Sequence, residues 1–330
     1  KDLLDLAKRC GCDYAKFQKR SPKELLNTDQ YDAPHPVPYN SYGATYGEHR
    51  EFLELDYESH KILFNYSKKI GITYFCTPCD IPSIDILEKI NVPFYKVASR
   101  DLTNIPLLEK LSILKKPVII STGMASIDDI DCAIEVLKLP KNKLIVMHCT
   151  SQYPCHPKNV NLKVIPELKK KYKTVVGYSD HTNGIITAVG AYMVGASVIE
   201  KHITLDRASK GTDHAGALEQ QGLVKLIEYL KTLEVNMGIK DKKVLPDTEY
   251  AKIKLSRSIT SKRTIKKGEF LTEDMICLKS PGNGLKWIDK NVIIGKKAIN
   301  NIPKNKTLFK NEFEWNKDIL FRYWWGMDRW

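Results

Sequence analysis

Short runs of β-branched residues alternate with amphipathic stretches through the first two thirds of the chain, and this alternation constrains the fold more than any other feature. A repeated strand–helix pattern is typical of a parallel sheet whose crossover connections are helices. So many repeats in this length predict a (β/α)8 TIM barrel within the α/β class. The expected strands span residues 13–19, 73–77, 94–99, 118–122, 144–150, 174–180 and 198–204.

Two of the segments between and after these strands carry clear helix signals. Ser126, with Asp129 three residues on, forms a capping-box pattern. Apolar residues at helical spacing follow on one face, namely Ile127, Ile130, Ile134 and Leu137, and a second set comprises Leu223, Leu226, Ile227, Leu230 and Leu233.

Only seven strands can be counted, although a (β/α)8 barrel needs eight. The chain opens with an apparent helix at residues 2–10, and in a (β/α)8 barrel a first strand should precede this helix. We therefore expect a TIM barrel that lacks its first strand in this chain, either because the sequence is truncated or because the gene product is itself incomplete.

The barrel is expected to cover residues 1–238 and to be followed by a lysine-rich linker at 239–255. At 256–315, β-prone runs are separated by the turn signals KKG, PGNG and IPKNK, which predicts a small, mostly β domain. The last stretch, 316–330, is an aromatic-rich tail. It is interpreted as a cap or docking segment, or as an extension with no catalytic role.

Composition narrows the cellular context and the partners. No apolar run approaches the roughly 20 residues of a membrane span, and the charged N-terminus lacks the apolar core of a signal peptide. We expect a cytoplasmic protein with no membrane partner, whose 8 cysteines are thiols.

The net charge of +13 is spread along the chain without a nucleic-acid-binding motif. We therefore expect no nucleic-acid partner, and this charge suits small anionic substrates.

Polar residues stand at the C-terminal ends of the expected strands, where a parallel barrel carries its active site. Lys16 and Lys96 fall at two of these ends, and the hydroxyl residues Thr77, Ser99 and Ser121 fall at three. A single lysine there is more often a surface residue. Two buried lysines are costly unless they meet anions. The combination predicts a cradle for a phosphate and a carboxylate on one small molecule.

Two histidines, His181 and His202, end consecutive strands, so their side chains can approach one cation. A lone histidine is usually structural. Two nitrogen ligands completed by water and substrate suit an octahedral Mn²⁺ or Mg²⁺ better than a tetrahedral zinc. Cys76 and Cys79 form a single CxxC pattern, which without a second cysteine pair is a weak zinc signal.

Several segments together resemble a known family. They are AKFQKR, ATYGEHR, VPFYKVASRDLTNIPLLE, KPVIISTGM, HCTSQYP, VVGYSDHTNGI and GASVIEKHITLDRASKGTDHAGALE. On these the chain resembles the sialic acid (N-acetylneuraminate) synthases, with legionaminate and pseudaminate synthases as close relatives. The unit carrying KKGEFLTEDM and PGNG is similar to that family's antifreeze-like (SAF) domain. The resemblance runs from about residue 7 to residue 314.

The resemblance implies roles for individual residues. Positions that match phosphoenolpyruvate contacts are Lys16, Thr77, Lys96, Ser99, Ser121, Ser151, Tyr153 and Ser179. His181 and His202 match the metal ligands, usually of Mn²⁺. Gln18 and Asp213 match residues that contact the sugar. Lys16, Lys96 and Glu200 are the implied catalytic residues, with Glu200 where family members carry an acid.

The implied reaction joins phosphoenolpyruvate to the open-chain aldehyde of an N-acylated amino-sugar, adds water and releases phosphate, giving a nonulosonic acid. The metal would act as a Lewis acid on the aldehyde oxygen. The family also implies a domain-swapped homodimer in which the SAF domain covers the partner's barrel mouth.

Three departures from the family pattern bear on these expectations. The first-strand motif with its glutamate is missing from this chain. Ser280, preceded by Lys279, stands where several members present an arginine to the sugar, and Ser151 stands where some members have an asparagine.

Two alternatives to the active synthase stay open. One is a non-catalytic or truncated remnant that keeps the fold and ligand binding. The other is a heptulosonate- or octulosonate-phosphate synthase, which would not explain the SAF unit. The acceptor can be N-acetylmannosamine, its 6-phosphate or a diacetylated sugar, and the loop at 29–46 is a candidate discriminator.

Overall fold

The computed structural model describes residues 1–315 and divides the chain into two compact units, Lys1–Gly238 and a second unit that begins at Ile239. Within the described part, no helix is both long enough and apolar enough to cross a membrane. All eight cysteines fall in this part and are free thiols. The tail at 316–330 lies outside the described residues, so the expectations for it stay predictions.

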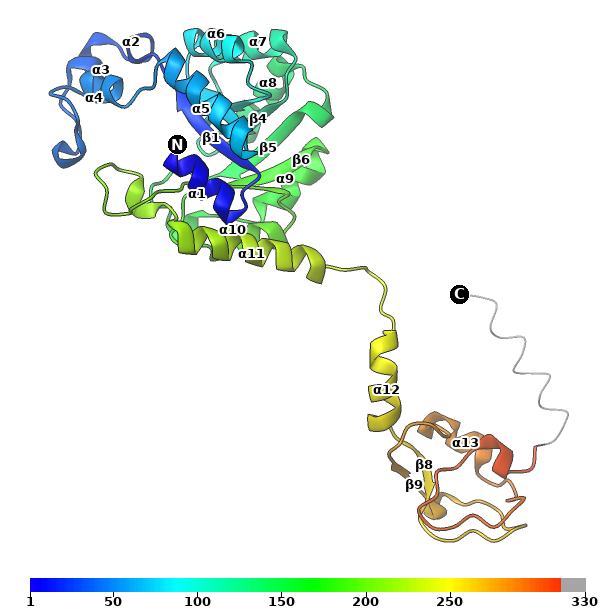
Figure 1. The fold of residues 1–330 in the computed structure, drawn as a ribbon. Helices are drawn as coiled ribbons and strands as arrows, with labels where there is room; N and C mark the ends of the chain where they lie inside the picture. The colour runs from blue at the N-terminus through cyan, green and yellow to red at the C-terminus, as the bar shows by residue number, and fades with distance from the viewer. Residues whose placement is uncertain (316–330) are drawn as a thin grey trace. The chain divides into compact units, whose positions relative to one another are not determined.

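Seven strands form one sheet in the first unit, and each pairs in parallel with the next along the chain (Figure 1). They are β1 (Tyr14–Lys19), β2 (Thr73–Pro78), β3 (Tyr95–Val97), β4 (Val118–Ser121), β5 (Leu144–Cys149), β6 (Val175–Asp180) and β7 (Val198–Lys201). This arrangement confirms the α/β fold with seven strands of a (β/α)8 barrel. Strand β3 is shorter than expected because Ser99 already begins a 3₁₀ turn.

Helices connect the strands and pack against them. They are α1 (Asp2–Cys10), α5 (Tyr57–Ile70), α6 (Ile81–Ile90), α7 (Ile105–Leu114), α8 (Ile127–Leu137), α9 (Val164–Tyr172), α10 (Ile186–Met193) and α11 (Gln220–Asn236). The predicted capping box is present at α8, where the Ser126 side chain accepts from the Asp129 backbone. Ile130 and Leu137 of that helix are buried, whereas Ile127 is exposed, so the predicted apolar face is only partly used.

Successive side chains of a strand alternate between the helices and the barrel interior. Tyr74 and Cys76 of β2 belong to the large core cluster against the helices. Phe75 belongs instead to a small interior cluster with Ile119 and Met147. Because the period is two, the next interior positions toward the strand ends are Thr77, Ser121 and Cys149. The interior therefore changes from apolar to polar at the carboxyl ends of the strands.

The connection between β1 and α5 carries three short helices, α2 (Pro22–Leu25), α3 (Thr28–Asp32) and α4 (Tyr46–Phe52). Thr45 and Glu48 form a capping box at the start of α4. The Tyr31 ring lies against Gly47, where an added Cβ would come within 2.3 Å of it, so only glycine fits there. These local contacts explain why the TYGEHR segment forms the capped helix α4.

The first regular element of the second unit is α12 (Pro246–Leu255), so the segment predicted as a linker contains a helix. Strands β8 (Ser258–Ser261) and β9 (Ile276–Lys279) pair antiparallel, and isolated bridges join the other extended segments. With α13 (Lys290–Ile293) they enclose an apolar core that includes Ile259, Leu271 and Leu308.

Short 3₁₀ turns occur in both units. Within residues 1–315 they are η1 (Pro38–Asn40), η2 (Ser99–Asp101), η3 (Lys141–Lys143), η4 (Pro157–Asn159), η5 (His214–Gly216), η6 (Glu273–Met275), η7 (Trp287–Asp289) and η8 (Lys310–Glu312).

Candidate active site

One carboxylate oxygen joins four strands at the polar end of the barrel. Glu200 Oε1, on β7, lies 2.9 Å from Lys16 Nζ on β1 and 3.3 Å from Lys96 Nζ on β3. It also accepts a hydrogen bond of 3.0 Å from Ser179 Oγ on β6. The structure therefore brings together both predicted lysines, the predicted acid and one predicted hydroxyl.

The electrostatics of this cluster depend on its burial. Lys96 is 2% exposed, and burial lowers its pKa to about 8 although Glu200 acts in the opposite direction. Burial alone would raise the pKa of Glu200, but Lys16 and Lys96 hold it well below its usual range. Two cations then share one carboxylate, which leaves positive charge for an anionic ligand.

Two hydroxyl groups without partners lie on the same interior face, at the carboxyl ends of β2 and β4. The side-chain oxygens of Thr77 and Ser121 are buried and make no hydrogen bond to any described residue. Buried hydroxyls normally find a partner, so these two are available to hydrogen-bond a ligand. Ser99 Oγ accepts from the Gly123 backbone at 3.0 Å. A Cβ on Gly123 would lie 2.4 Å from Ser151 Oγ, so glycine preserves the space between these serines.

The two histidines lie side by side, with 5.3 Å between ring centroids. The ring of Tyr153 lies 4.2 Å from that of His181, again between centroids. His181 Nδ1 bonds to the Thr150 carbonyl at 3.0 Å, which assigns the proton to Nδ1 and leaves Nε2 free to bind a metal. Burial lowers the pKa of both histidines, which favours the neutral form that ligates metals.

The predicted sugar contacts lie on two sides of this centre. Asp213 Oδ2 is 3.8 Å from His202 Nδ1, so it lies beside the histidine pair. Gln18 follows Lys16 on the same face of β1, and its Oε1 accepts a hydrogen bond of 3.0 Å from Arg20 Nη2. Ser280 belongs to the second unit, where its hydroxyl donates to the Leu255 carbonyl at 3.4 Å.

A buried ion pair that sequence reasoning missed supports the histidines. Lys201 Nζ lies 2.7 Å from Asp180 Oδ2, with side chains 4% and 0% exposed. Asp180 precedes His181 and Lys201 precedes His202, so the pair joins the strand ends that carry both rings. The sequence carries a signal for this ion pair. In SDH an acid directly precedes the histidine, and in EKH a base directly precedes the histidine.

Cys149 is a second residue that sequence reasoning missed. Its Sγ lies 3.6 Å from His181 Nδ1 and would be 2.9 Å from a Cβ on Gly123. The alternation of β5 alone could have placed it on the interior face, two residues beyond Met147.

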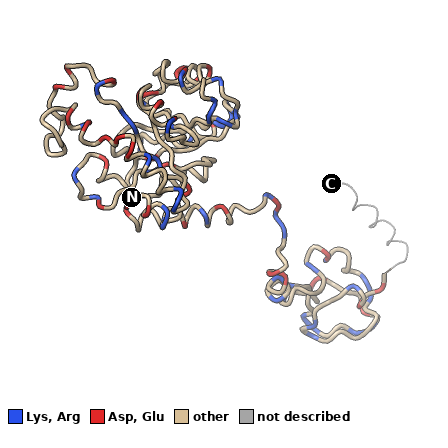
Figure 2. Tube along the Cα trace, turned by 45° about the horizontal axis from the view of Figure 1, so that its top comes forward, with Lys and Arg blue, Asp and Glu red and all other residues tan. Residues whose placement is uncertain are grey.

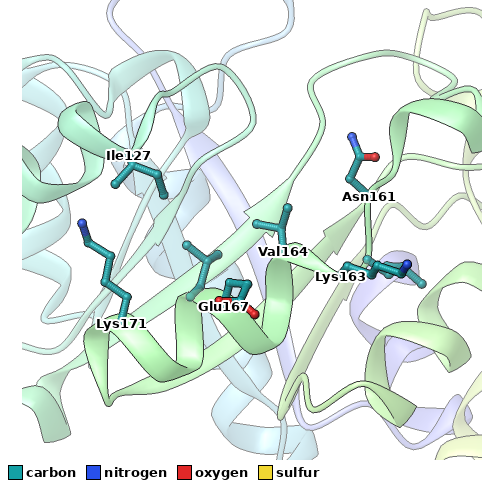
Figure 3. A pocket seen from close by; sticks show the side chains of 8 residues that line it. Ile127, Asn161, Lys163, Val164, Glu167 and Lys171 are labelled. Atoms are coloured by element: carbon teal, nitrogen blue, oxygen red, sulfur yellow. The ribbon is translucent and has the colours of Figure 1, made fainter.

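A cavity of about 840 Å³ opens elsewhere on the first unit, between α8 and α9 (Figure 3). It is lined by Ile127, by residues 161–164, and by Glu167, Leu168 and Lys171. None of the predicted site residues lies in it. The convergence of charged groups, and not this cavity, therefore marks the candidate active site.

Comparison with known proteins identifies the arrangement. The model of the NeuB family matches residues 3–242, and that of the SAF domain matches residues 256–314. The chain belongs to the NeuB family. This confirms the resemblance to sialic acid synthases, and it favours that family over the heptulosonate- and octulosonate-phosphate synthases.

Curated members of the NeuB family share about a third of their residues with this chain. N-acetylneuraminate-9-phosphate synthase from Homo sapiens is 35% identical over 94% of this chain and 87% of its own length. N,N'-diacetyllegionaminic acid synthase from Campylobacter jejuni is also 35% identical, over 93% of each chain. The solved structure of N-acetylneuraminic acid synthetase from Leptospira borgpetersenii, in complex with citrate, superposes with a TM-score of 0.66 at 30% identity, covering 76% of this chain and 83% of that one.

Proposed function

We propose that this NeuB-family chain condenses phosphoenolpyruvate with the open-chain aldehyde of an N-acylated amino-sugar, and with water, to give a nonulosonic acid and phosphate. The observation that supports this most is the convergence of Lys16, Lys96 and Ser179 on a single carboxylate oxygen of Glu200. A pocket that can hold one carboxylate in this way can hold the carboxylate or phosphate of a small substrate. The names of the curated relatives agree with such a product.

Phosphoenolpyruvate would take up the charge and the free hydroxyls of the pocket. Lys16 and Lys96 would bind its phosphate and carboxylate, and the unpartnered hydroxyls of Thr77 and Ser121 would donate to its oxygens. Ser99, Ser151, Tyr153 and Ser179 complete the proposed set of contacts. Both lysines are fixed on strands, so they hold the substrate in a reactive geometry before the acceptor binds.

His181 and His202 would hold a divalent metal. Among the described residues, no group of three or more histidine, cysteine, aspartate or glutamate side chains could hold one. A metal on two histidines keeps positions for water and substrate, which suits Mn²⁺ or Mg²⁺. When bound, such an ion supplies a Lewis acid for the aldehyde oxygen. Asp213 and Gln18 are the proposed sugar contacts.

In the proposed reaction, the C2=C3 π electrons of phosphoenolpyruvate form a bond from C3 to the aldehyde carbon, and the C=O π pair moves to the aldehyde oxygen. Water adds at C2, and one of its protons goes to that oxygen, which becomes a hydroxyl. The C2–O bond to phosphate then breaks, the phosphate leaves with the bridging oxygen, the bonding electron pair and the second proton of the water, and C2 becomes a ketone. Lys16 and Lys96 stabilise the negative charge on the leaving phosphate. Glu200 orients both ammonium groups by the contacts described above, and it must release them when the substrate enters.

The test is phosphate release from phosphoenolpyruvate in the presence of Mn²⁺ and each candidate amino-sugar. Release that requires both the metal and an amino-sugar is expected. Binding of phosphoenolpyruvate in calorimetry without turnover on any amino-sugar would instead support a non-catalytic protein that keeps ligand binding.

We also propose a cytoplasmic homodimer in which the SAF domain of one chain covers the barrel mouth of its partner. Such a cover would exclude water from the site. Size-exclusion chromatography with light scattering should give twice the chain mass of 37.7 kDa. A monomer at micromolar concentration would contradict the dimer.

A further inference from the structure

Lysines gather at the end of the barrel opposite the candidate active site. The last residues of α7, α8 and α9, with the loops that lead from them into β4, β5 and β6, span residues 112–117, 137–143 and 169–174 (Figure 1). We call these three segments the lysine face. They contain two, three and four lysines, and no aspartate or glutamate. Because the candidate site lies at the carboxyl ends of the strands, the lysine face lies at their amino ends, away from that site.

The three segments of the lysine face are joined into one surface by hydrogen bonds. Lys143 Nζ donates to the Lys115 carbonyl at 2.8 Å, which joins the second segment to the first. Thr174 Oγ1 donates to the Lys141 carbonyl at 2.8 Å, which joins the third segment to the second. The lysines of three separate loops therefore act together as one charged surface.

The lysine face is also level, and it exposes apolar side chains. Register pairs Val118 with Leu144, and Ile145 with Val175, so β4, β5 and β6 begin within one residue of one another. The loops before these strands consequently end at the same height. Ile113, in the first segment, is 73% exposed, and Val175, directly after the third, is 42% exposed. The surface thus combines cations with exposed apolar groups and has no groove among its loops that an item of extended chain would need.

Few carboxylates offset the charge of the lysine face. Lys116 pairs with Glu88 at 2.5 Å, and Lys171 pairs with Asp131 at 2.7 Å. The other seven lysines form no ion pair within residues 1–315. Glu135 is the acidic residue in the last turn of α8, and the last turns of α7 and α9 have none. Over the whole of these three helices and their loops, ten lysines stand against six carboxylates, so the surplus is positive.

Three of the lysines occupy backbone positions that favour glycine. Lys115, Lys138 and Lys173 directly follow α7, α8 and α9, with φ of 52°, 48° and 51°. Helices usually end in this left-handed region with glycine or asparagine, as α5 does at Gly71 and α6 at Asn91. A cation near a helix C-terminus is favourable, which accounts for one lysine at each helix end. It does not account for four lysines in the third segment or for the two in η3.

The composition of the lysine face favours a lipid bilayer over a nucleic acid as its partner. All its cations are lysines, so it lacks the guanidinium groups that bind phosphates through paired hydrogen bonds. Its one aromatic residue, Tyr172, is half-buried, with Lys171 Nζ 5.6 Å from the ring centroid, whereas base stacking needs open aromatic faces. Lysines around exposed apolar side chains are instead typical of surfaces that rest on anionic lipids.

We propose that the lysine face binds the surface of an anionic lipid bilayer, with its lysines against the headgroups and Ile113 at the level of the headgroup boundary. Such binding is peripheral and needs no membrane-spanning segment, whose absence was the basis for expecting no membrane partner. It leaves the candidate active site, at the other end of the barrel, facing away from the bilayer. The inference does not depend on the proposed function.

The experiment is flotation of the full chain with lipid vesicles. Vesicles of phosphatidylcholine alone are compared with vesicles in which phosphatidylserine makes up about a third of the lipid. We expect binding to the anionic vesicles only. Raising the salt from about 0.1 M to about 1 M should release the protein, because the Debye length falls from about 10 Å to about 3 Å.

A triple variant tests the lysine face directly. Lys115→Gly, Lys138→Gly and Lys173→Gly together remove three charges and keep the backbone, because glycine adopts a positive φ without strain. At about fivefold per lysine, the triple variant should bind anionic vesicles about 100-fold more weakly. Phosphate release in the proposed reaction should not change, so a failure of this inference is distinguishable from a failure of the proposed function.

The matched control replaces Lys240, Lys242 and Lys243 by glycine, which removes the same charge from an exposed segment between the units. It should bind anionic vesicles as the native chain does, and thermal unfolding should show that both variants fold. Equal binding by the two variants would overturn the inference. Tighter binding to double-stranded DNA than to the vesicles, or release from the vesicles by inorganic phosphate at constant ionic strength, would also overturn it.

Discussion

Lys96 shows how one buried residue links charge to function. Its side chain is 2% exposed and reaches Glu200 together with Lys16. A buried ammonium group is stable only because a carboxylate compensates it, and a substrate anion can take over that role. Its side chain is therefore the most direct probe of the anion pocket.

We expect Lys96→Met to weaken phosphoenolpyruvate binding by about 10- to 100-fold, because a charge-assisted hydrogen bond is lost. Methionine keeps an unbranched side chain only one atom shorter, and Glu200 keeps Lys16 as a partner, so the fold should persist. Calorimetry with phosphoenolpyruvate and thermal unfolding measure the two effects. Lys110→Met removes a partly exposed lysine paired with Asp85 at 2.9 Å and serves as the matched control. Unchanged affinity in the Lys96 variant would contradict the proposed pocket.

The pH dependence of binding follows from the lowered pKa of Lys96, which is about 8 in the free protein. Below that pH the ammonium group is already charged and binding needs no proton. Above it, binding must include proton uptake, so the affinity for phosphoenolpyruvate should fall as pH rises through 8. Titrations from about pH 7 to pH 9.5 measure this slope. The Lys96→Met variant should lose this part of the slope, and an unaltered slope there would assign it to another group.

At the scale of elements, the ends of β6 and β7 are joined by the buried pair of Asp180 and Lys201. Asp180 Oδ1 also accepts from the backbone and hydroxyl of Thr182 at 2.8 Å. The pair thereby fixes the turn that carries His181. These contacts join the two strand ends that carry His181 and His202.

We expect Asp180→Asn to lower the free energy of unfolding by about 3–5 kcal/mol, because Lys201 is left as an uncompensated buried charge. Urea denaturation measures the change. Asp131→Asn is the matched control, since its pair with Lys171 has the same length of 2.7 Å but is 44% and 42% exposed. The control should cost less than about 1 kcal/mol. Similar losses in the two variants would show that burial does not matter here.

At the scale of the whole molecule, the chain consists of two units with separate apolar cores. Both units carry lysines and arginines along their length, with carboxylates interspersed (Figure 2). The high net charge is therefore spread over both units instead of being confined to one segment.

The connection between the units should be the first site of proteolysis. Residues 239–245 are exposed and lack regular structure, and they contain Lys240, Lys242 and Lys243. Because exposed segments without hydrogen-bonded backbone are cut first, limited trypsin digestion should give two protected fragments that separate at these lysines. Mass spectrometry identifies the cuts. Early cleavage within α5–α9 would show instead that the barrel unit opens more readily than the connection.

Sequence alone predicted the strands and placed the candidate site residues at their carboxyl ends. Alternating apolar runs specified all seven strands, and Ser126 with Asp129 specified the start of α8, because period and capping are local properties. Strand ends also placed Lys16 and Lys96 together, and His181 beside His202, since parallel strands finish at one edge.

Only the tertiary structure decided which groups pair. The structure pairs Glu200 with both lysines, Asp180 with Lys201, and Tyr42 with Lys210. These pairs join segments that lie as far as 184 residues apart in the sequence. Such contacts follow from the curvature of the sheet and from loop packing, which no local pattern in the sequence records. The strand period set the direction of each side chain, and the packing of the curled sheet set its partner.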